Sequence, residues 1–195
     1  MNWINELYQR IEGQQLWYKT VTLARNEYLK VSGTIDTDLY FILSGSLKIF
    51  FIEEYEEHII RFGYQKNFIT ALDSFITGLS SDLYIQAIKK TDLKVISKSV
   101  YLQFINENDA NKELWNRIQE QLLLQQLERE KDILITSPKL RYERVLRRSP
   151  QLFQEIPNKY IASYLRMSPE TLSRLKKSWS KSIFKSSTWM KFVLK

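Results

Sequence analysis

The chain has 195 residues, enough for one large or two modest domains, with no cysteine and a single histidine, His58. This composition excludes disulfides, iron–sulfur clusters, thiolate metal sites and redox sensing through thiols. The net charge of +7 is uneven, because residues 136–195 hold 14 Lys/Arg against 3 Asp/Glu while residues 1–135 hold 15 against 19. A basic C-terminal third favours a polyanionic partner at that end of the chain.

No apolar run approaches the ~20 residues that a membrane span needs. The N-terminal segment MNWINELYQRIEG also lacks the basic start and apolar core of a signal peptide. We therefore expect a soluble, cytoplasmic protein without a membrane partner.

The first hundred residues predict a short helix followed by a β domain. Apolar residues at helical spacing indicate a helix over residues 3–11. Short β-branched or aromatic runs then follow, separated by turn pairs such as Ser32-Gly33, Ser44-Gly45, Thr77-Gly78 and Thr91-Asp92. These runs cover residues 16–23, 38–53, 58–64, 83–90 and 93–99. Several short strands at this spacing predict a barrel or sandwich.

From about Val100 the pattern becomes helical, and the run from about Ala110 to Ile135 has neither glycine nor proline. Its length predicts a helix near 38 Å long, at about 1.5 Å per residue. Its apolar positions cover more than half of the circumference: Leu114, Trp115, Ile118, Leu122, Leu123, Leu124 and Leu127. One face can pack on the β domain while another meets a second copy, which predicts a homodimer through residues 110–135. The alternative is a monomer whose own domains bury this helix.

After Ser137-Pro138 begins another predicted helix, which extends to about Arg148. Beyond it, the stretch YIASYLRMSPETLSRLKK (160–177) contains two short amphipathic runs. The second has an explicit start, with Ser168 as the cap, Pro169 at the first helical position and Glu170 at the positive end of the dipole.

Each run has one inward apolar stripe, Ile161 and Leu165 in the first and Leu172 and Leu175 in the second. Only residues 166–168 remain for the turn, so the two helices must cross sharply, with the small Ala162 between them. This arrangement is a helix-turn-helix.

Outward-facing residues of the second helix combine base-reading and phosphate-binding chemistry. Arginine can donate two bonds to guanine, a carboxylate can accept from cytosine, and serine can do either. The candidates are Glu170, Thr171, Ser173, Arg174, Lys176 and Lys177, with Lys176 as a phosphate contact and Arg166 in the turn as a further phosphate-reaching charge. The competing interpretation is an exposed ion pair between Glu170 and Arg174 worth ~0.3–0.5 kcal/mol. The cap, the turn and the surrounding positive charge favour DNA binding.

The order of a β barrel, a long helix and a basic helix-turn-helix resembles the Crp/Fnr family of bacterial transcription regulators. The resemblance rests on IASYLRMSPETLSRLKK and on DLYFILSGSLKIFF, where Gly33 and Gly45 correspond to turn glycines of the family's cyclic-nucleotide-binding roll. The segment FGYQKNFITALDSFITGL resembles regulators of this family from Bacteroidetes-like bacteria. The resemblance implies base contacts by Glu170, Ser173 and Arg174.

The family also implies a fold class and a domain order. We expect an α+β protein whose residues 1–109 form an antiparallel β-roll, a double-stranded β-helix of the cyclic-nucleotide-binding type. Residues 110–135 would then be the dimerisation helix and residues 136–195 the DNA-binding domain.

The phosphate-binding cassette departs from the family pattern. Where the family has a Gly-Glu pair and a phosphate-binding arginine, this chain has Ile69-Thr70 and Ser81, followed by Asp82. Without that arginine a buried phosphate loses a charge-assisted bidentate contact. We take these four residues as the candidate effector pocket and expect no response to cyclic AMP in the usual mode, no cofactor and an unidentified effector, if the roll binds one.

The C-terminus departs as well, because residues 178–195 (SWSKSIFKSSTWMKFVLK) show no hairpin that would form the family's wing. This atypical or missing wing is either a divergent tail or a basic, aromatic extension of the DNA contact or toward a membrane surface.

No catalytic constellation or nucleotide-binding loop occurs, and we expect no metal site. His58 follows an acidic hairpin segment and is expected at the surface, while the acidic run there is expected to be solvated. A β-barrel metalloenzyme would need several histidines, so we predict a protein that is not an enzyme.

These observations predict a dimeric transcription regulator that binds double-stranded DNA, with RNA polymerase as a further candidate partner. The alternative is a cyclic-nucleotide-like sensory or protein-interaction module whose DNA-binding domain has degenerated.

Overall fold

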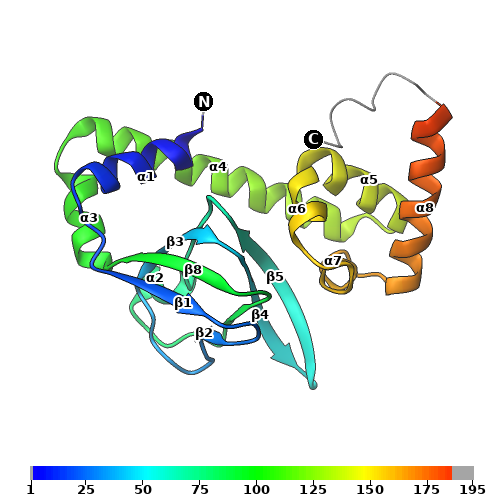
Figure 1. Cartoon of the computed structure of the whole chain (residues 1–195), viewed down its shortest axis with the longest axis horizontal. Coiled ribbons are helices and arrows are strands. Elements are labelled where there is room, and N and C mark those ends of the chain that lie inside the picture. Colours follow the sequence, from blue (N-terminus) through cyan, green and yellow to red (C-terminus); the bar gives the residue numbers. More distant parts are fainter. Residues whose placement is uncertain (1, 186–195) are drawn as a thin grey trace. The chain divides into compact units, whose positions relative to one another are not determined.

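The computed structural model describes residues 2–185 of the chain (Figure 1). Its contacts divide the chain into two compact units, Met1–Gln125 and Gln126–Lys195, and the division falls inside the long helix α4 (Asp109–Leu134). No helix among the described residues is both long and apolar enough to cross a membrane.

Two four-stranded antiparallel sheets make up the β-roll of the first unit (Figure 1). One sheet has the strand order β1-β8-β3-β6 and the other has the order β2-β7-β4-β5. The strands are β1 Lys19–Leu23, β2 Tyr28–Lys30, β3 Leu39–Ser44, β4 Ser46–Glu53, β5 Glu56–Tyr64, β6 Phe68–Ile69, β7 Tyr84–Ala87 and β8 Thr91–Ile96. Apolar side chains from both sheets form the roll's core, among them Ile42, Leu47, Ile85 and Leu93, which are fully buried.

Glycines make two of the roll's turns possible. Gly33 and Gly45 have φ angles of +81° and +94°, so the prediction that both are turn glycines is confirmed. At Gly45 space is also lacking, because an added Cβ would lie 2.3 Å from Thr91 Oγ1 and 2.5 Å from the carbonyl oxygen of Lys90. At Gly33 no atom lies within 4 Å of such a Cβ.

Four helices complete the first unit, and all four contribute to a second apolar core. The helices are α1 Trp3–Gly13, α2 Leu72–Thr77, α3 Lys98–Asn106 and the first part of α4. The core contains Leu7 and Ile11 of α1, Tyr101 of α3, and Leu114 and Ile118 of α4, all 3% exposed or less, together with Phe75 of α2. These residues anchor the start of α4 to the roll.

The second unit contains the last turns of α4 and four further helices: α5 Pro138–Arg148, α6 Pro150–Glu155, α7 Asn158–Tyr164 and α8 Pro169–Lys185. Its core is made of apolar side chains contributed by all four: Tyr142, Val145, Leu152, Ile156, Ile161, Ala162, Leu165 and Leu172.

Several predicted elements differ from the observed ones. The run 38–53 is two strands separated by Gly45, the run 83–90 is a strand only as far as Ala87, and β2, β6 and α6 were not predicted. At the C-terminus, residues 178–185 continue α8, whereas the sequence predicted an atypical tail there. The remainder of that predicted tail, residues 186–195, lies outside the described residues.

Candidate nucleic-acid interface

The second unit contains a helix-turn-helix made of α7, a short turn and α8. The two helices meet through apolar side chains: Ile161, Ala162, Leu165 and Leu172 are all 1% exposed or less. The small side chain of Ala162 lets the helices approach closely, as predicted from the sequence.

Arg166 makes the turn with a left-handed backbone, φ +50°, a conformation that costs a non-glycine residue about 1–2 kcal/mol. Hydrogen bonds support it on both sides. The amide of Arg166 donates to the carbonyl of Ser163 (2.9 Å), and its own carbonyl accepts from Arg141 Nη2 of α5 (2.9 Å). The turn is therefore tied to α5 as well as to α7.

Ser168 caps α8, as the sequence predicted. Its Oγ accepts from the amide of Thr171 (3.2 Å), its carbonyl accepts from the amide of Leu172 (3.1 Å), and Pro169 occupies the first helical position. The carboxylate of Glu170 accepts hydrogen bonds from the backbone amide of Glu170 and from the Ser168 hydroxyl, and these bonds lower the pKa of Glu170. The carboxylate at the start of α8 is therefore ionised at neutral pH and can only accept hydrogen bonds.

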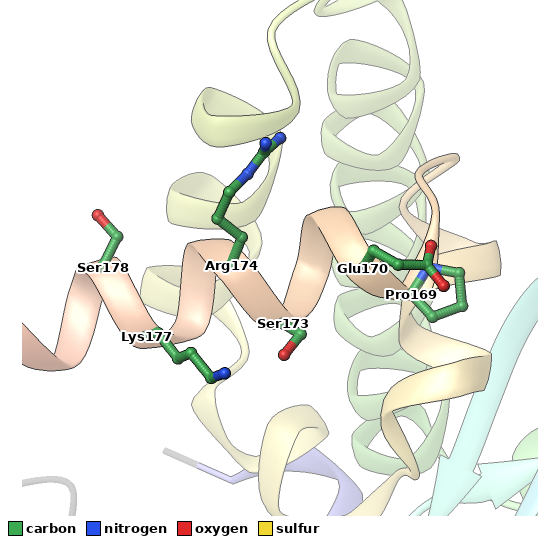
Figure 2. Close-up of a pocket in the computed structure, with 6 residues that line it drawn as sticks. All are labelled: Pro169, Glu170, Ser173, Arg174, Lys177 and Ser178. Carbon is green, nitrogen blue, oxygen red and sulfur yellow. The ribbon is translucent and has the colours of Figure 1, made fainter.

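Six residues of α8 line a hollow on its outer face (Figure 2). They recur every three or four positions, so they lie on one side of the helix: Pro169, Glu170, Ser173, Arg174, Lys177 and Ser178. In Figure 2 the Arg174 side chain extends from one edge of this face, while Ser173 and Lys177 extend from the other. We call Glu170, Ser173, Arg174 and Lys177 the reading face of α8.

Two other predicted DNA-binding residues lie beside the reading face. The hydroxyl of Thr171 is 3.2 Å from Ser168 Oγ, within the cap. Lys176 Nζ donates to Asn158 Oδ1 (2.8 Å) and so links α8 to the start of α7. The structure thus groups four of the seven predicted residues on the reading face, with Arg166 exposed in the turn. Ser178 was not predicted, although its position four residues after Arg174 was a usable signal.

Positive charge surrounds this helix-turn-helix. The exposed basic residues of the second unit outside α8 come from the end of α4, from α5, from α7 and from the turn: Lys131, Lys139, Arg147, Arg148, Lys159 and Arg166. An exposed cationic surface of this kind suits a phosphate backbone.

The four predicted effector-pocket residues lie in the roll with other partners. Ile69 pairs with Tyr40 in the sheet and is 4% exposed, and Thr70 Oγ1 donates to the carbonyl of Asp38 (2.8 Å). Ser81 is buried and its Oγ accepts from the amide of Leu83 (3.1 Å), whereas Asp82 is exposed.

A lysine that the sequence did not single out lies beside this segment. Lys30 is 4% exposed, and its Nζ donates to the carbonyls of Val31 (3.1 Å), Ser81 (3.1 Å) and Leu83 (2.7 Å). All three ammonium donors are thereby used. Burial lowers the pKa of Lys30. The cation that ties this segment to β2 is thus bonded to backbone carbonyls.

The carboxylate of Asp36 likewise accepts hydrogen bonds from within the roll. Tyr40 donates its hydroxyl to the carboxylate of Asp36 (2.9 Å to Oδ2), and the amide of Asp38 donates to Asp36 Oδ1 (3.0 Å). Burial raises the pKa of Asp36. Burial and the neighbouring carboxylate likewise raise the pKa of Tyr40.

His58 lies in β5, where its ring stacks on Phe51 with 5.0 Å between centroids and its Nε2 lies 3.9 Å from Glu53. The nearby hairpin turn places Tyr55 fully in solvent. Residues 2–185 contain no group of three or more His, Cys, Asp or Glu side chains placed to hold a metal ion.

The sequence matches no protein-family model and no curated protein. The structure is similar to a CooA mutant from Carboxydothermus hydrogenoformans, with a TM-score of 0.68 and 14% identity over 88% of this chain and 79% of that one. It is similar to FixK2 from Bradyrhizobium japonicum, with a TM-score of 0.68 and 14% identity over 84% and 85% of the two chains.

The global regulator CLP of Xanthomonas campestris gives a TM-score of 0.63 and 16% identity, with 91% of this chain and 92% of CLP covered. These three proteins are Crp/Fnr regulators. The chain shares their fold. The predicted fold class, an antiparallel β-roll with a long helix and C-terminal helices, is therefore confirmed.

Proposed function

We propose that the chain is a dimeric transcription regulator of the Crp/Fnr type that binds duplex DNA through α8. The observation that carries the proposal is the reading face: an ionised carboxylate, a hydroxyl, a guanidinium and an ammonium group lie on one exposed side of a capped helix. The fold shared with solved regulators supports it.

Each group of the reading face has a role that its chemistry suits. Arg174 donates two hydrogen bonds to the O6 and N7 atoms of a guanine, and Glu170 accepts from the N4 amino group of a cytosine. Ser173, between them, donates to or accepts from a neighbouring base. Lys177 lies one turn further along α8 and neutralises a phosphate, as do the exposed cations of the turn and of α7.

Exposed leucines on α4 support a dimer. Leu123, Leu124, Leu127 and Leu134 are 71%, 63%, 47% and 74% exposed in the single chain. Leu123, Leu127 and Leu134 recur at spacings of four and seven residues, which places them along one side of the helix. A second copy on this side covers apolar surface that one chain leaves in water, and it presents two reading faces about 34 Å apart, one DNA turn.

The regulator does not depend on cyclic AMP in the usual mode. Where the resemblance implies a phosphate-binding arginine, the chain has Ser81, whose carbonyl accepts from the buried Lys30. A bound phosphate would have to displace carbonyl partners from Lys30, which is costly for a buried charge. The protein works in the cytoplasm, and RNA polymerase is its expected protein partner.

Selection of bound fragments from a random duplex library, followed by sequencing, tests the proposal. We expect a near-palindromic site with half-sites about one helical turn apart, and a Kd for that site at least about 10³-fold below the Kd for random DNA. Enrichment of no sequence, with equal Kd values for all duplexes at low salt, would contradict the proposal and favour the sensory or protein-interaction module.

A further inference from the structure

Asp132 is a completely buried carboxylate at the end of α4. It is 0% exposed, and both of its oxygens accept from arginines of α5. Oδ1 accepts from Arg144 Nε (3.0 Å), and Oδ2 accepts from Arg148 Nη2. A buried carboxylate is tolerated when charged hydrogen bonds of this kind compensate for the lost water.

Glu128, one turn earlier on α4, extends the pair into a network. Its Oε2 accepts from Arg144 Nη2 (2.7 Å) and lies 3.7 Å from Arg148 Nη1. Each arginine therefore bridges two carboxylates of α4. Such a network has one low-energy arrangement, because a shift of α5 along α4 would separate Asp132 from both guanidinium groups while leaving it buried.

From α5 the connection continues to the helix-turn-helix. Arg141 donates from Nη1 to the carbonyl of Ile135 (2.6 Å), just after α4, and from Nη2 to the carbonyl of Arg166 in the turn. On α5 the ring of Tyr142 meets Trp179 of α8 edge to face, with 6.3 Å between centroids. The end of α4, α5, the turn and α8 are therefore joined by consecutive contacts within one unit.

We propose that Asp132 is a positioning residue that fixes the direction of α8 relative to the end of α4, so that the pair of reading faces accepts only one half-site spacing. This inference rests on the proposed function, because it concerns the geometry of a dimer on DNA. If α5 packs on the end of α4 in a single arrangement, the two reading faces of the dimer are held at one separation. If several arrangements were possible, several separations would be allowed. Asp132 touches no base or phosphate in this mechanism and acts through Arg144 and Arg148.

The half-site spacing that the protein tolerates is the decisive measurement. Full-length wild-type protein is titrated onto the selected site and onto versions with one or two base pairs added to or removed from the spacer. The same titrations follow for Asp132→Asn and for Glu130→Gln, an exposed residue of α4 whose substitution removes the same charge. A residue needed only for folding would lower the active fraction without changing the ratio of Kd values between spacers.

For wild type and Glu130→Gln we expect a strong preference for one spacer. For Asp132→Asn we expect that preference, expressed as a ratio of Kd values, to fall by about tenfold, with the Kd for random DNA unchanged. If Asp132→Asn keeps the wild-type ratio, or Glu130→Gln loses it equally, the inference is wrong.

Should Asp132→Asn fail to fold, Arg148→Gln replaces it, because this variant keeps the bond between Asp132 and Arg144. A smaller loss of spacer preference is expected, and an unchanged preference would overturn the inference. Failure of the proposed function gives a different result: wild-type protein that prefers no sequence over random DNA contradicts both, whereas a selective wild type with an equally selective Asp132→Asn contradicts the positioning role alone.

Discussion

Arg129 of α4 stacks its guanidinium on the ring of Tyr164, 3.6 Å from the ring centroid, and so joins the long helix to the first helix of the helix-turn-helix. Burial lowers the pKa of Arg129, although a guanidinium remains charged at neutral pH. A partly desolvated cation–π pair of this kind contributes roughly 1–2 kcal/mol.

We therefore expect Arg129→Ala to lower the free energy of unfolding of the second unit by about 1–2 kcal/mol. Urea unfolding followed by far-ultraviolet circular dichroism measures it. Arg117→Ala is the matched control, because its guanidinium lies 5.2 Å from the Trp3 ring and its side chain is 48% exposed. An Arg129→Ala midpoint equal to that of wild type would show that the stacking adds nothing.

Arg174 and Lys177 should differ in what they contribute to DNA binding. Arg174→Ala should cost ~1–3 kcal/mol at one base pair and relax discrimination there, whereas Lys177→Ala should weaken binding to all sequences and reduce the salt slope by about 1. Lys176→Ala should have a smaller effect than Lys177→Ala, because Lys176 is bonded to Asn158. Titrations at several salt concentrations measure these effects.

Lys90→Ala, which removes an exposed positive charge from the roll, is the control for charge alone. Equal losses on specific and random DNA for Arg174→Ala and Lys177→Ala would contradict the division of roles within the reading face.

Substitutions at Arg166 can distinguish the role of its left-handed backbone from the role of its charge. Arg166→Gly removes the strain of φ +50°, so we expect unchanged or slightly higher stability together with weaker binding to every duplex. Arg166→Val should lower stability by about 1–2 kcal/mol relative to Arg166→Gly, because a β-branched residue tolerates this conformation poorly. Thermal unfolding compares the two, and a valine variant as stable as the glycine variant would argue against a strained turn.

Lys30 should be essential to the stability of the roll. Lys30→Met fills a similar volume but removes the ammonium donor from the carbonyls of Val31, Ser81 and Leu83, at a cost of about 3 kcal/mol. Lys90→Met, at an exposed position of the same unit, should change stability little. Urea unfolding measures both, and a Lys30→Met roll as stable as wild type would mean that the three bonds only offset the burial of the charge.

The buried carboxyl of Asp36 should make the stability of the roll depend on pH. Its pKa is raised by burial from an ordinary value of 3.8, so folding disfavours the charged form. Stability is therefore greatest when Asp36 is protonated, below the ordinary pKa, and decreases as the pH rises through the folded-state pKa.

Asp36→Asn cannot ionise, and it keeps an acceptor oxygen for the amide of Asp38 and the hydroxyl of Tyr40. We expect this variant to be more stable than wild type at pH 7, with the difference vanishing below pH 3.8. Unfolding curves across this range test the sign, with exposed Asp82→Asn as the control. A difference that persists unchanged at low pH would trace the effect to packing.

Much of the fold was predictable because its long elements carry local signals. The run from Ala110 to Ile135 has no helix breaker, and the Ser168 cap with Pro169 fixed the start of α8. Strands β2 and β6 were not predicted, because segments of three and two residues are too short to show a periodic pattern. They are stabilised by pairing with β7 and β3, respectively.

The site was predictable to the extent that helical spacing determines it. Glu170, Ser173, Arg174 and Lys177 follow the spacing of three or four residues, and the same rule could have separated Lys176 from them. Lys30 left no such signal. Its burial depends on the carbonyls of Ser81 and Leu83, about fifty positions later in the chain, which a local pattern cannot reveal.

The two turn glycines, Gly33 and Gly45, should differ in which substitutions they tolerate. In a saturation library, codon 33 should tolerate asparagine, whose side chain accepts a positive φ and would meet no neighbour. Codon 45 should return glycine alone, because even a methyl group there would collide with Thr91 and with the backbone of Lys90.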